Sequence, residues 1–439
     1  MTERRISGGT VRVEEHDGVV RARGIPYGRA TRFQPAQPAS WSRVHDATRR
    51  GAACPQPPSR LAWVTGSVLD GLSTSEDCLV VTVTAPADAD GLPVMVWFHG
   101  GAYVSGSGES PKYDAGRLVR DGDVVVVNVS YRLGIFGYLA PAGAQAEDNL
   151  GLRDQILALR WVRDNIAVFG GDPANVTAFG QSAGGDSVWS LMLAREAEGL
   201  FHRAIVQSAP LGLRTRGGQD WLRTRGGQDW LRGDRDALAQ AMAEAMATAL
   251  GGASPAAATI EQLLAAEAEA ITAAQAFGQL SGMPFAPLLG RRPLPDAADV
   301  PGRLADAAGR VELLVGYTRD DAAPFVTTFG QAIDVASTEA LTKLFFAAPA
   351  EQLAETWTRH GGRAASYRFD WAPAHAPVGA CHCMELPFLF GSTQVWADAE
   401  MLGPDRVIDE ALGRELRTRW AQFAHRGVES LPAGPLVFG

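Results

Sequence analysis

Short runs of apolar residues recur along the chain and alternate with segments of helical periodicity. Leu92–Phe98 reads LPVMVWF and residues 123–131 read DVVVVNVSY, and neither run alternates between apolar and polar positions. Continuous Val-rich runs are typical of parallel strands that are covered on both faces. Further buried strands are predicted at 176–179, 204–207, 311–315 and 365–369.

Helical segments separate these predicted strands. Within residues 151–169, Leu152, Ile156, Leu159 and Val162 fall at helical spacing. Strands that alternate with helices predict an α/β fold, with a mostly parallel central sheet and helices on both faces. The start of the chain is richer in Gly, Pro and Arg and has shorter strand signals. We expect an antiparallel sheet there, which leads into the main one.

A compositional island interrupts the pattern at residues 212–300. The nonapeptide LRTRGGQDW at 213–221 recurs unchanged at 222–230. A copy this short cannot stack a repeat core, so we expect a local duplication in a tolerant surface loop. Two Ala-rich helices are predicted after it, at 236–250 and 259–276. We interpret the island as a helical, cap-like insertion over the active site; the alternative is a helical pair that only packs over the sheet.

Composition narrows the class of protein. The 439 residues allow a single large domain over 1–439, and a net charge of −9 disfavours nucleic acid as a partner. No uninterrupted apolar stretch reaches the roughly 18 residues of a membrane span, and Gly rather than an apolar signal region follows the N-terminal arginines. A cytoplasmic protein without membrane contact is expected, and its oligomeric state is left open.

The four cysteines do not form a recognisable framework. They are too few for a disulfide scaffold, and Cys381-x-Cys383 has no second pair with which to build a zinc site. We therefore expect no metal.

Gly180-Gln181-Ser182-Ala183-Gly184 matches G-x-S-x-G, the nucleophile elbow of α/β-hydrolases. A serine hydroxyl is a weak nucleophile, so it must stand on a sharp turn where a base reaches it. A predicted strand at 176–179 precedes the motif and a helical segment at 186–194 follows it. This context favours Ser182 as a nucleophile and the α/β-hydrolase fold.

A second glycine motif closes a strand upstream of the elbow. His99-Gly100-Gly101 follows the predicted strand Leu92–Phe98, as the oxyanion loop of such hydrolases does. Backbone N–H groups there stabilise the negative charge that acyl transfer builds on the carbonyl oxygen. The predicted oxyanion-hole donors are the N–H groups of Gly101, Ala102 and Ala183, and Tyr103 is a candidate for the border of the acyl site.

The motifs together resemble the type-B carboxylesterase family, which includes bacterial p-nitrobenzyl esterases, animal carboxylesterases and cholinesterases. The resemblance covers most of the chain, from about residue 10 to 427. It rests on the opening RGIPYG at 23–28, on SEDCL at 75–79, and on the block from Asp148 to Gly185 that ends in the elbow. It implies the α/β-hydrolase fold and hydrolysis of carboxylic esters through a covalent acyl-serine.

The resemblance also implies the other two members of a catalytic triad. Asp321 falls where the family usually has Glu followed by Gly, whereas Ala322 follows it here, and Asp320 is an adjacent rival. His382 stands in the family's H-x-x-E-x-x-x-x-F frame, which His375 lacks. The order Ser182, Asp321, His382 agrees with the α/β-hydrolase order of nucleophile, acid and base.

Two further features follow from the resemblance. Gln181 stands before the nucleophile where the family commonly has Glu, so a neutral amide replaces a buried charge. Cys54 and Cys78 occupy positions that form a disulfide in secreted relatives; in a reducing cytosol we expect free thiols, and a bridge formed on oxidation is the alternative.

The expected function is hydrolysis of small to medium esters by Ser182, Asp321 and His382, with a small-molecule ester as partner. This hydrolysis requires no metal and no organic cofactor. Two alternatives stay open. An amidase, lactonase or carbamate hydrolase would use the same triad, because a fold does not determine the substrate. A non-catalytic cholinesterase-like binding protein is the second alternative, and the intact serine and histidine argue against it.

Overall fold

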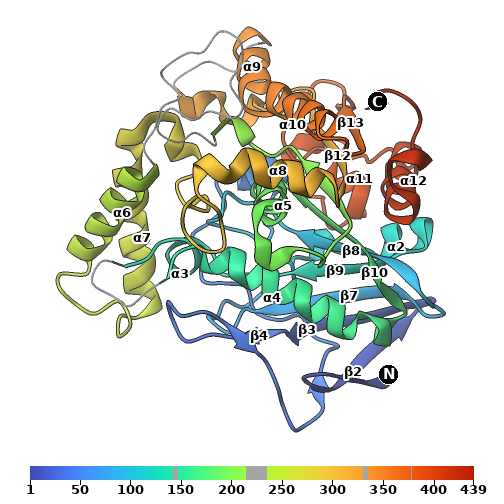
Figure 1. The fold of residues 1–439 in the computed structure, drawn as a ribbon, viewed down its shortest axis with the longest axis horizontal. Helices are drawn as coiled ribbons and strands as arrows, with labels where there is room; N and C mark the ends of the chain where they lie inside the picture. Colours follow the sequence, from blue (N-terminus) through green and yellow to red (C-terminus); the bar gives the residue numbers. More distant parts are fainter. Residues whose placement is uncertain (142–146, 214–234, 330–334, 377) are drawn as a thin grey trace.

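The computed structural model describes residues 1–141, 147–213, 235–329, 335–376 and 378–439. In this part of the chain one 12-stranded sheet runs in the order β1-β2-β3-β7-β9-β8-β10-β11-β12-β13-β14, with β6 paired to β2 (Figure 1). The duplicated nonapeptides lie outside the described residues from position 214 onward, so their predicted loop stays a prediction.

The centre and one side of the sheet are parallel. β8 is flanked by β9 and β10 in parallel, and β11 to β14 continue from β10 in the same direction. The bounds of these strands are β8 Leu92–Phe98, β9 Val125–Val129, β10 Gly171–Gln181, β11 Arg203–Gln207, β12 Glu312–Thr318, β13 Ala364–Phe369 and β14 Leu436–Phe438.

The predicted antiparallel start of the chain is present. β1, β2, β3 and β7 pair antiparallel with one another, and β7 joins β9 of the main sheet. The bounds are β1 Thr2–Ile6, β2 Gly9–His16, β3 Val19–Pro26, β6 His45–Asp46 and β7 Val80–Pro86, and β4 Gly28–Arg29 and β5 Gln37–Pro38 form a separate two-stranded sheet.

Helices cover both faces of the sheet, as the uninterrupted apolar strands predicted. Along β8 the side chains of Val94 and Val96 enter one hydrophobic core, and those of Met95 and Trp97 enter another. Because successive residues of a strand point to opposite faces, the two cores lie on opposite sides of the sheet.

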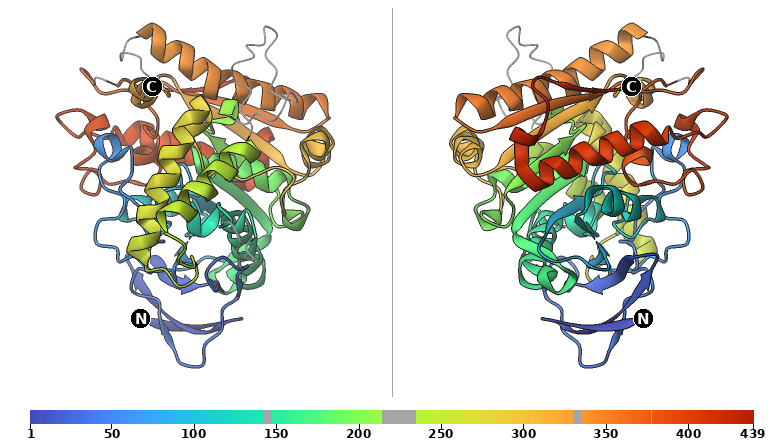
Figure 2. Two further views of the ribbon diagram at one scale, coloured as in Figure 1. Left: turned by 90° about the vertical axis from the view of Figure 1, so that its left-hand side faces the viewer. Right: turned by 90° about the vertical axis from the view of Figure 1, so that its right-hand side faces the viewer.

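Each core is closed by its own helices. The first contains residues of α4 Leu150–Asn165, α5 Ala183–Leu193, α8 Val300–Ala308 and α10 Ala348–Arg359. The second contains residues of α2 Gly116–Gly122, α11 Leu386–Phe390 and α12 Glu410–Arg426, and α12 lies across the face turned to the viewer in the right-hand view of Figure 2. The remaining α-helices are α1 Ala62–Thr65, α3 Gly134–Gly137 and α9 Val335–Thr342.

The two Ala-rich helices of the insertion pack side by side at one side of the molecule (Figure 2). α6 spans Arg235–Ala249 and α7 spans Ile260–Ala274, close to the predicted bounds. α7 begins with a capping box, in which Thr259 and Gln262 satisfy each other's backbone N–H groups. Leu238, Met242 and Leu263 bury the inner face of the pair in the first core.

Some predicted bounds were wrong at their ends. The strand predicted at 123–131 is confined to Val125–Val129, because a left-handed residue, Asp123, ends α2 just before it. The helix predicted at 151–169 stops at Asn165, and 3₁₀ turns cover Ile166–Phe169. No helix of the described residues is long and apolar enough to cross a membrane.

Candidate active site

The carboxyl ends of neighbouring parallel strands bring the candidate residues to one edge of the sheet. Ser182 follows β10 and Ser208 follows β11, and the last residues of these strands, Gln181 and Gln207, are paired in register. Asp321 lies just beyond β12, the next strand along. This edge is where open α/β sheets place their ligand sites.

Ser182 stands on a strained turn between β10 and α5. Its backbone has φ 58° and ψ −124°, a conformation that costs a non-glycine residue free energy, and its N–H donates to Gln207 O at 2.8 Å. Close packing requires glycine beside it, because a Cβ on Gly184 would lie 1.9 Å from the carbonyl oxygen of Phe98. The sequence therefore folds into a sharp strand-to-helix turn with the serine at its apex.

His382 and Asp321 are held together in the interior. His382 Nδ1 lies 2.5 Å from Asp321 Oδ1, and their side chains are 1% and 0% exposed. The second oxygen of Asp321 accepts from Ser208 Oγ at 2.7 Å and from the Thr318 N–H at 3.0 Å. These two donors fix the carboxylate so that its other oxygen faces the imidazole.

The two rival residues lie elsewhere. Asp320 accepts from the Ala380 N–H at 2.8 Å and pairs with Arg319 at 2.8 Å. His375 lines a different pocket, next to Trp63 and Met401. The structure therefore places Asp321 against His382 and leaves both competitors outside this contact.

The glycine-containing loop that follows β8 also lies against Ser182. A Cβ on Gly100 would lie 3.1 Å from Ser182 Cβ. Gly101 and Ala102 have φ 116° and 55°, and Gly101 O closes the loop by accepting from Val104 N and Ser105 N. Ala183 begins α5, so its N–H is one of the unpaired donors at a helix N-terminus. The three predicted donors thus lie on the segments that meet at Ser182.

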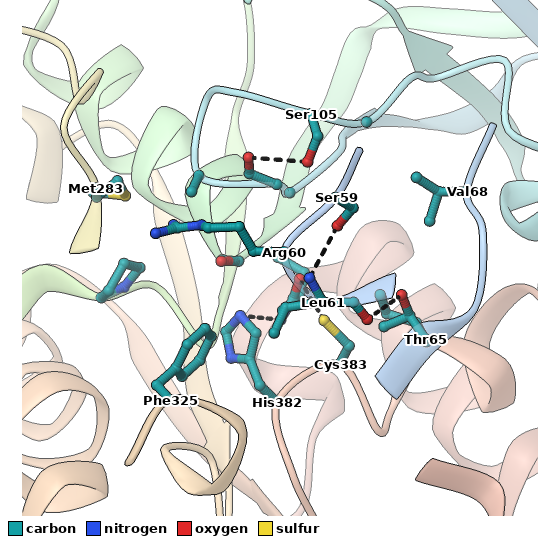
Figure 3. A pocket seen from close by; sticks show the side chains of 18 of the residues that line it. Ser59, Arg60, Leu61, Thr65, Val68, Ser105, Met283, Phe325, His382 and Cys383 are labelled. Carbon is teal, nitrogen blue, oxygen red and sulfur yellow. Dashed lines mark hydrogen bonds between the residues drawn. The ribbon is translucent and has the colours of Figure 1, made fainter. Parts of the chain in front are cut away.

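Ser182 and His382 open into one pocket of about 980 Å³, its open mouth included. Gly100, Gly101 and Ala102 form part of its wall. Figure 3 shows Phe325 beside the His382 ring, with their ring centroids 5.1 Å apart. Much of the remaining wall is apolar, including Leu61, Val68, Met283, Phe346, Leu386 and Trp396. An apolar wall with few convergent polar groups is typical of a small-molecule site.

Comparison with known proteins decides the family. The profile of the carboxylesterase family matches residues 2–340 and 327–435. The chain belongs to the carboxylesterase family. It is therefore a carboxylic-ester hydrolase with an α/β-hydrolase fold, as the resemblance predicted.

Individual relatives cover nearly the whole carboxylesterase. A probable N-octanoylanthranilate hydrolase of Rhodococcus erythropolis is 39% identical over 434 residues, which is 94% of this chain and 90% of the relative. The para-nitrobenzyl esterase of Bacillus subtilis is 34% identical and covers 97% of this chain and 90% of its own. Among solved structures, a thermophilic p-nitrobenzyl esterase has a TM-score of 0.79 at 32% identity, with 97% and 91% of the two chains covered.

This carboxylesterase departs from its family at Gln181, the residue before Ser182. Gln181 Nε2 lies 3.1 Å from His382 Nε2, and its Oε1 accepts from Cys383 Sγ at 3.5 Å. His382 Nδ1 faces a carboxylate and so carries the proton, which leaves Nε2 as an acceptor. The amide of Gln181 therefore donates to the ring nitrogen on the side that faces the pocket.

The candidate role of Tyr103 at the acyl site was wrong. Tyr103 is fully buried, its hydroxyl donates to Asp186 Oδ2 at 2.6 Å, and it is absent from the wall of the described pocket. The left-handed backbone at Ala102 and Tyr103 turns this side chain into the core instead.

The cysteines of the carboxylesterase are buried free thiols. Burial raises the pKa of Cys54, and a hydrogen bond with Cys78 raises it further, so the two thiols are in contact. Cys381 and Cys383 flank His382, and burial raises the pKa of each. Among the described residues no cluster of His, Cys, Asp or Glu is arranged to hold a metal ion.

Three features of the site were not found from the sequence. Ser208 donates a hydrogen bond to the carboxylate of Asp321, and its position directly after β11 is the signal that points to it. Phe325 and Phe346 pack against His382 from segments with no motif of their own. Arg60 lines the pocket from a stretch that carries no motif.

Proposed function

We propose that the chain hydrolyses carboxylic esters through a covalent acyl-Ser182, with His382 as general base and acid and Asp321 as the residue that orients it. The observation that carries the proposal is the buried contact between His382 Nδ1 and Asp321 Oδ1, in a pocket wall that also contains Ser182. A carboxylate on Nδ1 fixes the tautomer in which Nε2 accepts a proton.

In the acylation step the Ser182 oxygen attacks the ester carbonyl while its proton passes to His382 Nε2. The negative charge that develops on the carbonyl oxygen is stabilised by the N–H groups of Gly101, Ala102 and Ala183. The tetrahedral intermediate collapses, the C–O bond to the alcohol breaks, and His382 gives its proton to the departing alkoxide.

In deacylation a water molecule takes the part that the serine hydroxyl played in acylation. His382 takes a proton from water as the water oxygen attacks the acyl-Ser182 carbonyl; the bond between the carbonyl carbon and Ser182 Oγ then breaks, His382 returns its proton to Oγ, and the carboxylic acid is released. In the resting structure Gln181 occupies the hydrogen-bonding position on His382 Nε2. A small rotation of the amide or of the imidazole must therefore accompany proton transfer from Ser182.

The insertion supports a cap role. Leu213, Gly282 and Met283, from the segment 212–300, line the pocket beside Ser182. We propose that residues 1–439 form one domain and that the segment 212–300 closes one wall of the acyl site. We also propose a cytoplasmic location, because buried free thiols are compatible with a reducing compartment. The name of the Rhodococcus relative adds a medium-length acyl chain to the substrates worth testing.

Replacement of the nucleophile tests the proposal. Ser182→Ala is expected to lower kcat for p-nitrophenyl acetate, butyrate and octanoate by about a thousandfold or more. The circular dichroism spectrum and Tm serve as controls for folding. A variant that keeps the wild-type fold and the wild-type turnover would contradict the proposed nucleophile.

A further inference from the structure

Among the described residues that line the largely apolar pocket, Arg60 carries a permanent positive charge. The side chain of Arg60 crosses the cavity in the direction of Met283, on the side of Phe325 and His382 (Figure 3). Its Nη2 donates to the carbonyl oxygen of Gly282 at 2.7 Å. A guanidinium has five N–H donors in a planar fork, so donors remain for a bound molecule besides the one that contacts Gly282.

Arg60 has no acidic partner in the part of the chain that the structure describes. Ion pairs hold many other arginines, such as Arg132 to Asp154 at 2.7 Å and Arg32 to Glu76. Arg60 is solvent-exposed where it lines the pocket, and no neighbouring carboxylate of the described residues contributes to its electrostatics. An exposed guanidinium without a counterion gains charge-assisted hydrogen bonds when an anion enters the pocket beside it.

A second cation near the pocket is already neutralised. Lys112 Nζ lies 4.8 Å from the ring centroid of Trp396, which belongs to the pocket wall, and it forms an ion pair with Asp398. Of Arg60 and Lys112, therefore, Arg60 is the residue whose charge is available to a bound molecule.

The backbone holds Arg60 in place. Leu61 N donates to Ser59 Oγ at 3.2 Å and Ala62 N donates to Ser59 O at 3.1 Å, which forms the turn into α1. Beyond α1, Ser67 N donates to Asp398 Oδ2 at 2.8 Å. A cation on an anchored turn is preorganised for binding, because little backbone freedom is lost when a ligand arrives.

We propose that Arg60 makes this esterase selective for esters that carry a carboxylate group in addition to the bond that is cleaved. The apolar wall takes the hydrocarbon part of such a substrate, and the guanidinium takes the carboxylate through a two-pronged pair of hydrogen bonds. The inference rests on the proposed function, since it assigns a substrate class to the same pocket.

The test compares matched anionic and neutral esters. One pair places the charge on the acyl side, with mono-4-nitrophenyl glutarate against 4-nitrophenyl methyl glutarate. The other places it on the leaving group, with 2-acetoxybenzoate against its methyl ester. The readout is the ratio of kcat/KM for the anionic ester over the neutral ester, after subtraction of the enzyme-free rate, in the wild type and in Arg60→Met, Arg60→Lys and Arg43→Gln.

For at least one pair, Arg60→Met is expected to lower this ratio by about 10- to 100-fold, chiefly through a higher KM, because a hydrogen-bonded charge pair is lost. Arg60→Lys keeps the positive charge but loses the planar guanidinium, and its ratio is expected to lie between those of Arg60→Met and the wild type. Arg43, which is exposed and forms no ion pair with any described residue, provides a matched loss of one charge and is expected to leave the ratio unchanged.

Each other outcome overturns the inference. A change of less than about fivefold in both pairs would mean a screened surface charge rather than a binding residue. A loss that is equal for anionic and neutral esters would show that Arg60 only holds Gly282 in place. A wild type that cleaves neutral esters but neither anionic one would overturn the selectivity alone, whereas a wild type that cleaves no ester would overturn the proposed function and this inference with it.

Discussion

Gln181 Nε2 lies 3.1 Å from His382 Nε2, so the residue before Ser182 contacts the ring nitrogen that accepts the serine proton in the proposed mechanism. The family commonly has Glu in this position. A neutral amide donates a hydrogen bond to the unprotonated ring, whereas a carboxylate in the same place attracts the protonated ring.

This relationship predicts the effect of restoring the family residue. Gln181→Glu is expected to move the acidic limb of the kcat/KM profile to higher pH by about one unit, because a nearby negative charge favours the protonated imidazole, which cannot act as a base. The measurement is a pH–rate profile with p-nitrophenyl butyrate. Gln181→Leu removes the hydrogen bond without adding charge, and an equal upward shift in that variant would contradict the explanation.

Replacement of the neighbouring acids Asp320 and Asp321 is expected to lower kcat by very different amounts. Asp321→Asn is expected to lower kcat by about 10⁴-fold, because the amide no longer fixes the productive tautomer of His382. Asp320→Asn changes a carboxylate that bonds Ala380 N and Arg319, not the imidazole. The loss at 321 is expected to exceed the loss at 320 by about a hundredfold in single-turnover assays. Equal losses, or a larger loss at 320, would contradict the assignment of the orienting acid.

Glu267 of the inserted helix α7 predicts a pH-dependent stability. It accepts from the Ile135 N–H at 3.1 Å, and burial raises its pKa from 4.5 to about 7. Between these two values the folded state binds a proton that the unfolded state has lost, so stability falls as pH rises through this window. Glu267→Gln is expected to abolish this loss, which amounts to about 3 kcal/mol.

Urea unfolding at pH 5 and pH 8 measures this difference. The wild type should lose more stability than Glu267→Gln between the two pH values. Glu269→Gln changes an exposed acid on the same helix and is expected to behave as the wild type does. An identical pH dependence in wild type and Glu267→Gln would show that this carboxyl ionises alike in the folded and unfolded chain.

The strands and the elbow were predictable because their signals are local. The Val-rich runs that became β8, β9 and β12 are buried on both faces, and such strands show in the sequence without reference to their partners. β14, with three residues, and α12, with many charged side chains, were not predicted, since their placement depends on packing against β13 and α2.

The features of the candidate site also divide into those that the sequence predicted and those that depend on the folded structure. Ser182 stands in the G-x-S-x-G motif between a predicted strand and a predicted helix, and the resemblance to the carboxylesterase family implied His382. The contact of Gln181 with His382 depends on side-chain conformation, and the place of Arg60 depends on how the segment before α1 folds over the pocket. Neither property is written in a local pattern, because each arises where segments distant in the sequence meet.

The most direct test of the central claim is to map the adduct of a fluorophosphonate probe by mass spectrometry. The account predicts a single modification, on the peptide that contains Ser182, and its loss in both Ser182→Ala and His382→Asn. A wild-type protein that hydrolyses p-nitrophenyl butyrate yet carries no adduct, or carries it on a different residue, would contradict the claim that Ser182 is the activated nucleophile.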